Sequence, residues 1–294
     1  MRPTGIHAFQ YALFGRDGSL DPGLMARQVE LCVSAGASGV AVLGLGTEVH
    51  KLSAAERRTV VEWTAWDLGG RLPLAVTCAE TSVDDQVDMA RVALANGASW
   101  IILQPPPSRG GGEAGLVEHF ARVAGAVDAP VAIQNAPEFL GHGLSAAGFE
   151  RLRGLAPNVT IVKAEGTAVS VARMAEALGD GFAILNGRCG LELVENLRGG
   201  CCGMMPATET IDLQTAIFAA HAAGDADRAD ALYERLAPAV SFVMQGIDHF
   251  LLYGKMLLAA RLGLDPVPQR QPADVATEFG AAVVRRLAAR LGPL

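Results

Sequence analysis

The residues whose types and spacing most suggest chemistry are Lys163 and Glu165, which follow the apolar stretch Val159–Val162. That stretch is rich in β-branched residues and is typical of a strand covered on both faces. Loss of water at a buried strand end favours the neutral amine of a lysine, the form that attacks a carbonyl to make a Schiff base. Glu165 lies two residues further on, so an extended backbone places it on the same face. A purely structural ion pair is the alternative.

The composition indicates a folded chain with an acidic balance. Of its 294 residues, 50% are hydrophobic and 19% are charged, which argues against disorder. No apolar run reaches the length of a membrane span, and the N-terminal residues lack the apolar segment of a signal peptide. The formal net charge of −7 argues against a nucleic-acid binder, which needs a basic surface. We therefore expect neither a nucleic-acid nor a membrane partner.

The cysteines and histidines do not form recognisable metal or redox motifs. The five cysteines lack C-x-x-C spacing, and the six histidines lack the spacing of metal ligands. We expect reduced thiols in a cytoplasmic protein, with no bound metal and no cofactor. The cysteines are Cys32, Cys78, Cys189, Cys201 and Cys202.

Repeated helix-to-strand units are expected to position the lysine. The segment Ala35–Gly44 recurs as Asn96–Gln104, and in each copy a helix ends near a glycine before a short apolar strand. Units of this kind make parallel strands joined by helical crossovers. The eight predicted strands are Gly5–Phe9, Gly39–Leu43, Pro73–Thr77, Trp100–Leu103, Val131–Gln134, Val159–Lys163, Ala183–Asn186 and Cys202–Met205.

Eight such units predict an α/β fold, a closed (β/α)8 TIM barrel with a C-terminal helical extension and its active site at the carboxyl ends of the strands. The alternative, a doubly wound open sheet, binds nucleotides through a glycine-rich turn, but no G-x-G-x-x-G sequence follows any predicted strand. We expect the barrel over residues 1–223 and a helical domain packed on it over residues 224–294. The later helices are predicted at Thr210–Ala223, Ala226–Met244, Phe250–Leu262 and Val275–Leu291.

Residues at the other predicted strand ends complete the candidate site. The glycines of Gly44–Glu48, after the second strand, let backbone N–H groups approach a ligand carboxylate. For the amide side chains at the strand ends, a loop or helix-cap hydrogen bond is the alternative role. The substrate-binding candidates are Gly46, Thr47, Glu48, Gln104, Asn186 and Met205, and the catalytic candidates are Lys163, Glu165 and Gln134.

A single lysine at the end of the sixth strand, facing a glycine-rich carboxylate site, is the layout of a class I aldolase or lyase. The amine condenses with a 2-oxo acid, and the resulting iminium draws electrons from the neighbouring C–C or C–O bond as it breaks. The expected partner is therefore a small-molecule 2-oxo acid.

Together these residues make the sequence resemble the dihydrodipicolinate synthase/N-acetylneuraminate lyase family over almost the whole chain. The resemblance implies a (β/α)8 barrel with a C-terminal helical domain and a homo-oligomer, either a dimer or a tetramer. It also implies that Lys163 is the Schiff-base residue and that the strand-two loop receives the carboxylate of a pyruvate-type substrate. The blocks that carry it are Phe14–Asp21, Gly44–Arg57, Gln134–Pro137, Val162–Gly166 and Gly199–Met205.

The chain departs from the family's usual motifs at three places. The strand-two loop reads Gly-Leu-Gly-Thr-Glu in place of Gly-Thr-Thr-Gly-Glu, which leaves one hydroxyl, Thr47, at a shifted position. Gln134 stands where the family has a proton-relay tyrosine, and Phe139 stands where the synthases carry an arginine for a second carboxylate. These departures disfavour 4-hydroxy-tetrahydrodipicolinate synthase activity. The only tyrosines are Tyr11, Tyr233 and Tyr253.

The Gln-Asn-Ala-Pro sequence at Gln134, combined with Lys163 and Glu165, is similar to the branch that dehydrates 2-keto-3-deoxy sugar acids. We expect Lys163 to form the iminium, and Glu165 or a bound water to remove a C3 proton before hydroxide leaves C4. Gln134 and Thr47 are expected to orient the substrate. A glutamine cannot act as a general acid or base at neutral pH, so the proton transfer of the missing tyrosine falls to another group.

Other activities stay open at this point. Aldol cleavage of a 2-oxo-3-deoxy acid to pyruvate needs the same iminium. A non-catalytic barrel that binds a 2-oxo acid is disfavoured because a buried strand-end lysine is unfavourable unless it is used. A metal-dependent lyase lacks clustered ligands. Specificity is expected in the loops Pro105–Gly112 and Glu138–Gly143, whose low charge indicates a small, mostly uncharged substrate tail.

Overall fold

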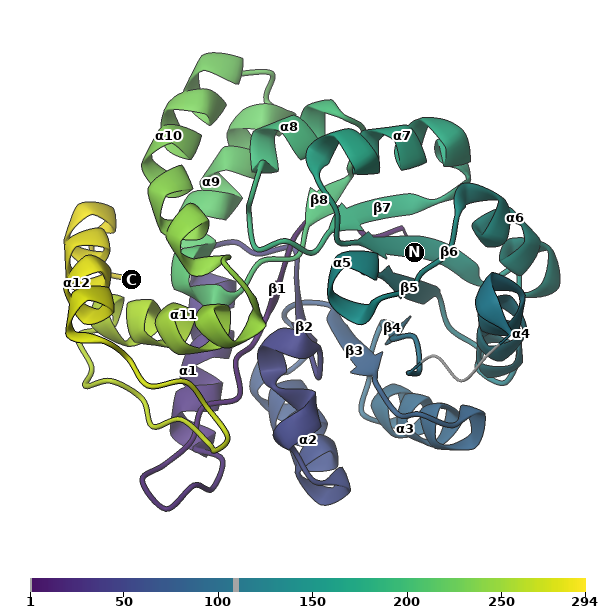
Figure 1. The fold of residues 1–294 in the computed structure, drawn as a ribbon, viewed down its shortest axis with the longest axis horizontal. Helices are drawn as coiled ribbons and strands as arrows, with labels where there is room; N and C mark the ends of the chain where they lie inside the picture. The colour runs from purple at the N-terminus through teal and green to yellow at the C-terminus, as the bar shows by residue number, and fades with distance from the viewer. Residues whose placement is uncertain (1, 108–110) are drawn as a thin grey trace.

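The computed structural model describes residues 2–107 and 111–294 as a closed ring of eight parallel strands surrounded by helices (Figure 1). Each strand pairs with the next, and the last returns to the first, so the predicted TIM barrel is confirmed. The strands are β1 (Gly5–Phe9), β2 (Gly39–Val42), β3 (Leu74–Cys78), β4 (Trp100–Leu103), β5 (Val131–Asn135), β6 (Val159–Ala164), β7 (Ala183–Asn186) and β8 (Gly203–Met204).

The first helices begin at side-chain caps. Asp21 accepts a hydrogen bond from the N–H of Leu24, and Ser53 forms a capping box with Glu56. The helices are α1 (Pro22–Ser34), α2 (Ala54–Leu68), α3 (Val83–Ala95), α4 (Gly112–Ala124), α5 (Pro137–Leu140), α6 (Ala146–Leu155), α7 (Ala168–Leu178), α8 (Leu193–Arg198), α9 (Ile211–Ala222), α10 (Ala226–Val243), α11 (Ile247–Arg261) and α12 (Glu278–Leu291). Short 3-10 helices are η1 (Leu45–Thr47), η2 (Val49–Lys51), η3 (Gly179–Gly181) and η4 (Thr208–Thr210).

Three strands, β1, β4 and β7, have the predicted bounds, and the boundaries of the other five differ by at most one residue. The eighth strand was expected over Cys202–Met205, but β8 covers only Gly203–Met204, and β5 continues one residue further than expected, to Asn135. A strand ends where its hydrogen bonds to neighbouring strands end. Because those neighbours are distant in sequence, the local residue pattern does not determine the last residue of a strand.

The C-terminal helices bring apolar side chains to the mouth of the barrel. In Figure 1, α10, α11 and α12 lie together at one side of the ring. Helix α11 packs against α12 and against η1 and η4, which follow β2 and β8 at the carboxyl ends of the strands. The division of the chain into two domains at residue 223 stays a prediction.

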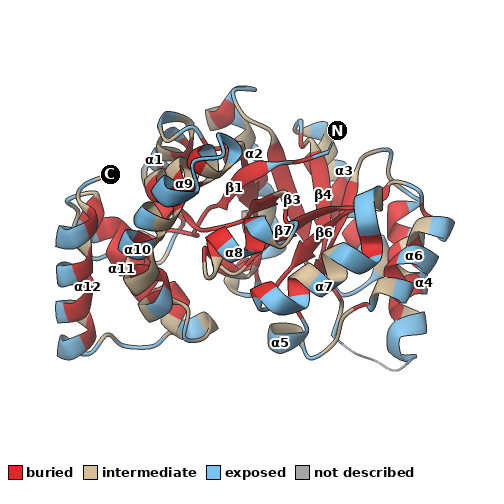
Figure 2. Cartoon of the chain, turned by 90° about the horizontal axis from the view of Figure 1, so that it is seen from above, coloured by how far each residue is buried: buried red, intermediate tan, exposed pale blue. Residues whose placement is uncertain are grey.

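The interior of the barrel and the layer beneath its helices are filled by buried residues (Figure 2). Every residue of β4 and β7 is buried, as the apolar strand runs predict for a parallel sheet covered on both faces. All five cysteines are free thiols. Within residues 2–107 and 111–294, no helix combines the length and the apolar character needed to cross a membrane.

Candidate active site

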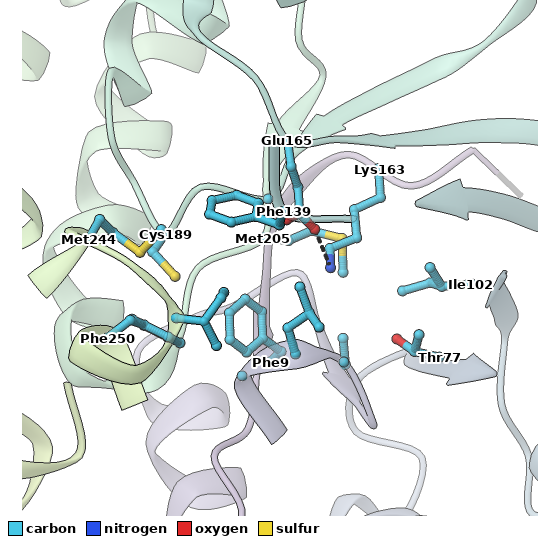
Figure 3. A pocket seen from close by; sticks show the side chains of 16 residues that line it. Phe9, Thr77, Ile102, Phe139, Lys163, Glu165, Cys189, Met205, Met244 and Phe250 are labelled. Carbon is cyan, nitrogen blue, oxygen red and sulfur yellow. Dashed lines mark ion pairs between the residues drawn. The ribbon is translucent and has the colours of Figure 1, made fainter. Parts of the chain in front are cut away.

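Lys163 and Glu165 form a buried ion pair at the carboxyl end of β6 (Figure 3). Lys163 Nζ lies 2.8 Å from Glu165 Oε1, and both side chains are 5% exposed. The alternation of the strand places them on one face, as their spacing predicts. Gly187, just after β7, leaves room for the pair, because a Cβ there would lie 2.8 Å from Glu165 Cγ and 2.9 Å from Lys163 Cε.

Gln134 supports the pair from the neighbouring strand β5, where it lies opposite Lys163. Its Nε2 donates to Glu165 Oε1 at 2.8 Å, and its side chain is fully buried. Among the described residues, its Oε1 has no hydrogen-bond partner. Gln134 does not line the adjoining cavity, so its contacts fit a residue that positions Glu165.

The ion pair faces a cavity of about 470 Å³, counting its open part, between the strand ends and α11 (Figure 3). Besides the pair, two polar side chains line it, Thr77 on β3 and Cys189 after β7. Most of the other lining side chains are apolar, and they come from β1, α5 and the start of α11 as well as from the strand ends. They include Phe9, Phe139, Met205, Met244, Ile247 and Phe250.

The loop after β2 presents backbone donors at this cavity. Gly44, Leu45 and Gly46 line it, and within the described chain the N–H groups of Leu45 and Gly46 have no hydrogen-bond partner. These are the first N–H groups of η1, which a short helix leaves unpaired. Such donors suit a carboxylate.

Gly46 and Met205, both predicted from the sequence, line the cavity. A Cβ on Gly46 would collide with the ring of Phe9, so the glycine allows η1 to pack against that ring. Met205 follows β8 and is 1% exposed. Both lie where the sequence places them, and their roles toward a ligand stay proposals.

Thr47 and Glu48, which the sequence analysis assigned to substrate binding, do not line the cavity. Thr47 Oγ1 instead donates to the backbone oxygen of Gln10 at 2.7 Å. Glu48 is fully buried between two cations, Lys51 Nζ at 2.6 Å and Lys255 Nζ of α11. These contacts hold the strand-two loop against α11, and burial lowers the pKa of Lys255 while Glu48 acts in the opposite direction. In this structure neither side chain lines the cavity, and the assignment of both residues to substrate binding stays a prediction.

Gln104 and Asn186 also lie outside the cavity lining. Asn186 Nδ2 donates to the backbone oxygen of Gly166 at 3.0 Å and to Asn196 Oδ1 at 2.8 Å. These two hydrogen bonds of Asn186 match the alternative role, a loop hydrogen bond, that the sequence analysis gives for amide side chains at strand ends. The backbone oxygen of Gln104 accepts a hydrogen bond from Gln86 Nε2 at 2.9 Å. The assignment of both residues to substrate binding stays a prediction.

No tyrosine of the chain lines the cavity. Tyr11 is fully buried, and its hydroxyl donates to Glu209 Oε2 at 3.0 Å. Burial, reinforced by Glu209, raises the pKa of Tyr11 well above its ordinary value. Tyr233 and Tyr253 lie on α10 and α11. Within the described chain, Glu165 is the one carboxylate that lines the cavity, so it is the available proton acceptor.

Sequence reasoning missed Thr77 and Cys189. Thr77 is 2% exposed and lines the cavity from β3. A threonine inside a strand pattern is typical of strand structure alone. Cys189 has a φ of 53°, and burial raises the pKa of its thiol well above the ordinary value, so the thiol is neutral. The position of Cys189 after the seventh predicted strand is the signal that would have found it.

The two loops that were expected to set specificity are joined by a hydrogen bond, and one of them lines the cavity. The Glu138–Gly143 loop contributes Phe139 to the lining. His142 Nε2 donates to the backbone oxygen of Pro106 at 2.8 Å and so joins this loop to the one after β4. Residues 108–110 of the Pro105–Gly112 loop, including Arg109, lie outside the described residues.

Comparisons with known proteins give matches over nearly the whole chain. The model of the dihydrodipicolinate synthetase family matches residues 2–288. A 4-hydroxy-tetrahydrodipicolinate synthase of Methanothrix thermoacetophila is 31% identical over 230 residues, covering 77% of each chain. An uncharacterized DapA-like lyase of Halobacterium salinarum is 29% identical over 280 residues, covering 92% of this chain and 89% of the relative.

The solved structures give the same fold. The crystal structure of YagE, a prophage protein from E. coli K12 belonging to the dihydrodipicolinic acid synthase family and in complex with pyruvate, has a TM-score of 0.91 to this chain. The match covers 98% of both chains at 23% sequence identity. At this identity the likeness shows a shared architecture.

Proposed function

The chain belongs to the dihydrodipicolinate synthetase family of class I lyases and aldolases, and on this basis we propose that it binds a pyruvate-type 2-oxo acid as a Schiff base on Lys163. The observation that carries this proposal is the buried pair of Lys163 and Glu165, 2.8 Å apart on the cavity wall. A carboxylate at hydrogen-bond distance can accept a proton from the ammonium, which frees the amine to attack C2.

The carboxylate of the 2-oxo acid binds at η1. An ideal Cβ on Gly44 would lie 3.9 Å from Lys163 Nζ and 3.7 Å from Thr77 Oγ1, so these three residues converge on one small space. The unpaired N–H groups of Leu45 and Gly46 and the hydroxyl of Thr77 supply donors there. Thr77 thus provides a hydroxyl where the family's usual threonines are missing from the strand-two loop.

The reaction that we propose is the loss of water from a 4-hydroxy-2-oxo acid. The amine of Lys163 adds to C2, and the carbonyl oxygen leaves as water with two protons, one from the amine and one that Glu165 took from the ammonium, so Glu165 is ionised again. The iminium acidifies C3, and Glu165 removes a C3 proton to give an enamine. The enamine expels the C4 hydroxyl as water, with the proton returned by Glu165, and C3=C4 forms. Hydrolysis of the iminium releases a 2-oxo-3-enoic acid and restores the amine.

Aldol cleavage to pyruvate is the rival reaction, and it starts from the same iminium. It needs a base that takes the proton of the C4 hydroxyl, the kind of proton transfer for which the family's relay tyrosine is suited. Gln134 stands in that place, and it cannot act as a base. Dehydration therefore fits the cavity better. Analysis of the products separates the two, because dehydration keeps the carbon count.

Further proposals concern the identity of the substrate, the oligomeric state and the cellular location. The 2-keto-3-deoxy sugar acid indicated by the Gln134 motif stays a prediction. 4-Hydroxy-tetrahydrodipicolinate synthase activity is disfavoured because an apolar side chain, Phe139, lines the cavity where a second carboxylate needs a cation. A homo-oligomer, dimer or tetramer, and a cytoplasmic location are carried forward as proposals from the sequence.

Reduction with borohydride in the presence of pyruvate tests the proposed Schiff base. The chain contains three lysines, Lys51, Lys163 and Lys255, with side chains 6%, 5% and 0% exposed. Of these, Lys163 alone lines the cavity, and the other two are paired with Glu48. Intact mass and peptide mapping are therefore expected to place one pyruvate-derived group on Lys163.

Lys163→Ala is the control for this experiment and should give no adduct with pyruvate. An unmodified wild-type protein would overturn the Schiff-base proposal, as would a group distributed over Lys51 and Lys255. A stable, folded Lys163→Ala variant, checked by circular dichroism, excludes unfolding as the cause of a missing adduct.

Replacing Thr77 with valine is expected to raise the pyruvate concentration for half-maximal trapping by about tenfold or more. The change keeps the shape of the side chain but removes a hydrogen bond to a charged carboxylate. Trapping at a series of pyruvate concentrations measures the effect. Thr160→Val, at the amino end of β6, is a matched strand control. Equal half-saturation in both variants would mean that Thr77 does not contact the carboxylate.

A further inference from the structure

We propose that the substrate carries an apolar aromatic group beyond C4, in place of the hydroxyl-rich tail of a sugar acid. The inference deepens the proposed function and rests on it, since the tail is located relative to an imine on Lys163. The lining of the cavity beyond that lysine supports it.

The cavity has two unlike sides with Lys163 between them. In Figure 3, Thr77 lies on one side of Lys163, and Phe139, Cys189, Met244 and Phe250 lie on the other. The Thr77 side holds the Thr77 hydroxyl and, close to it, Gly44, where the loop with the N–H donors for the substrate carboxylate begins. The remainder of a 2-oxo acid joined to Lys163 at C2 therefore extends toward the other side.

Aromatic side chains from distant parts of the chain meet on this second side. Phe9 of β1 and Phe250 of α11 lie edge to face, with ring centroids 6.2 Å apart and planes at 71°. Lys163 Nζ lies 5.8 Å from the centroid of the Phe9 ring, so aromatic surface begins beside the reacting amine. Phe139 of α5 adds a third ring. A planar apolar tail finds offset or edge-to-face partners here.

Hydrogen-bonding groups are scarce on the same side. Of the described lining residues there, Glu165 is the one charged group, and the proposed elimination uses it at C3 and C4. Cys189 contributes a neutral thiol, which is a weak donor and a weak acceptor. Met205 and Met244 offer only thioether sulfur. Tail hydroxyls would lose their water without gaining partners, whereas an apolar tail gains by leaving water.

Phe139 is the residue best placed to select the tail. It is partly exposed and lines the same cavity as Glu165, the group that acts at C3 and C4 (Figure 3). The loop that carries it is held by the hydrogen bond from His142 to Pro106. This hydrogen bond restrains the backbone of the loop before the substrate arrives, which favours discrimination between tails.

A competition experiment tests this inference. The protein is mixed with equal amounts of 2-oxo-4-phenylbutanoate and 4,5-dihydroxy-2-oxopentanoate at subsaturating concentration, and the imines are reduced with borohydride. Intact mass then compares the two adducts. We expect the phenyl adduct in at least tenfold excess, and we expect Phe139→Gln to lower that excess several-fold. Phe279→Gln, at a residue 77% exposed on α12, is the matched control and should leave the excess unchanged.

Trapping with pyruvate alone, run in parallel, tests the Schiff base on Lys163 separately from the aromatic tail. A pyruvate adduct on Lys163 without a phenyl excess, or with an excess of the dihydroxy acid, would overturn the aromatic-tail inference and leave the Schiff-base function standing. An equal excess of the phenyl adduct in Phe139→Gln and in the wild type would also overturn the aromatic-tail inference, because that inference rests on the lining of this cavity. Absence of every adduct would remove the proposed function itself.

Discussion

Replacing Glu165 with glutamine is expected to slow the exchange of the methyl protons of pyruvate for deuterium by about 10² to 10⁴-fold. Exchange requires the imine on Lys163 to lose a C3 proton, and an amide cannot accept that proton at neutral pH. Glutamine keeps the size of the side chain and one oxygen for Gln134. Proton NMR in deuterium oxide measures the loss of the methyl signal without any need to know the natural substrate.

Glu165 is proposed both to free the amine and to remove the C3 proton, and trapping with borohydride tells which of these two roles limits the exchange. If Glu165 is the base, the adduct on Lys163 persists in Glu165→Gln while exchange falls. Glu234→Gln, at an exposed position on α10, should change neither. Exchange at the wild-type rate in Glu165→Gln would show that another base removes the proton. Loss of both signals would place the role of Glu165 in freeing the amine.

Replacing Glu48 with alanine is expected to lower the free energy of unfolding by about 3 to 5 kcal/mol. Glu48 is fully buried and accepts hydrogen bonds from Lys51 Nζ at 2.6 Å and from Lys255 Nζ. Its removal leaves the ammonium of Lys255 buried without a counter-charge, beside the ring of Phe14 at 5.0 Å. Urea unfolding followed by circular dichroism measures the loss.

Two variants make this stability prediction specific. Glu30→Ala breaks the exposed ion pair of Glu30 with Arg71 and is expected to leave the unfolding midpoint nearly unchanged. The double variant Glu48→Gln with Lys255→Met removes the two fully buried charges, leaves Lys51 its hydrogen bond to the backbone oxygen of Arg270, and should recover most of the loss. A Glu48→Ala midpoint close to that of Glu30→Ala would contradict the assigned role of Glu48.

The sequence predicts well what depends on local periodicity. The strand β6 is recognisable from its β-branched run, and the two-residue spacing of Lys163 and Glu165 is enough to bring them together. The barrel follows from the repetition of helix-to-strand units, each of which spans a short stretch of chain. Gly46 and Met205 line the cavity close to the ends of strands that the sequence reveals, and their roles toward a ligand stay predictions.

What the sequence does not predict depends on partners far away along the chain. Glu48 was interpreted as a site carboxylate because it follows a glycine-rich loop, but its partner Lys255 lies 207 residues later, inside a helix of mostly apolar residues. Thr47 and Thr77 illustrate the same difficulty, because which of two threonines faces the cavity depends on how η1 packs against β1 and α11. The aromatic side of the cavity joins Phe9 to Phe250, and no local pattern links them.

The burial of all three lysines makes opening of the fold measurable by proteolysis. An endoproteinase that cleaves only after lysine meets side chains that are at most 6% exposed, so it cuts chiefly molecules that have opened. Lys51 and Lys255 join η2 to α11, whereas Lys163 lies inside the barrel. Cleavage at the first two before the third would show that α11 detaches while the barrel stays closed, and the rates would give the free energy of each opening.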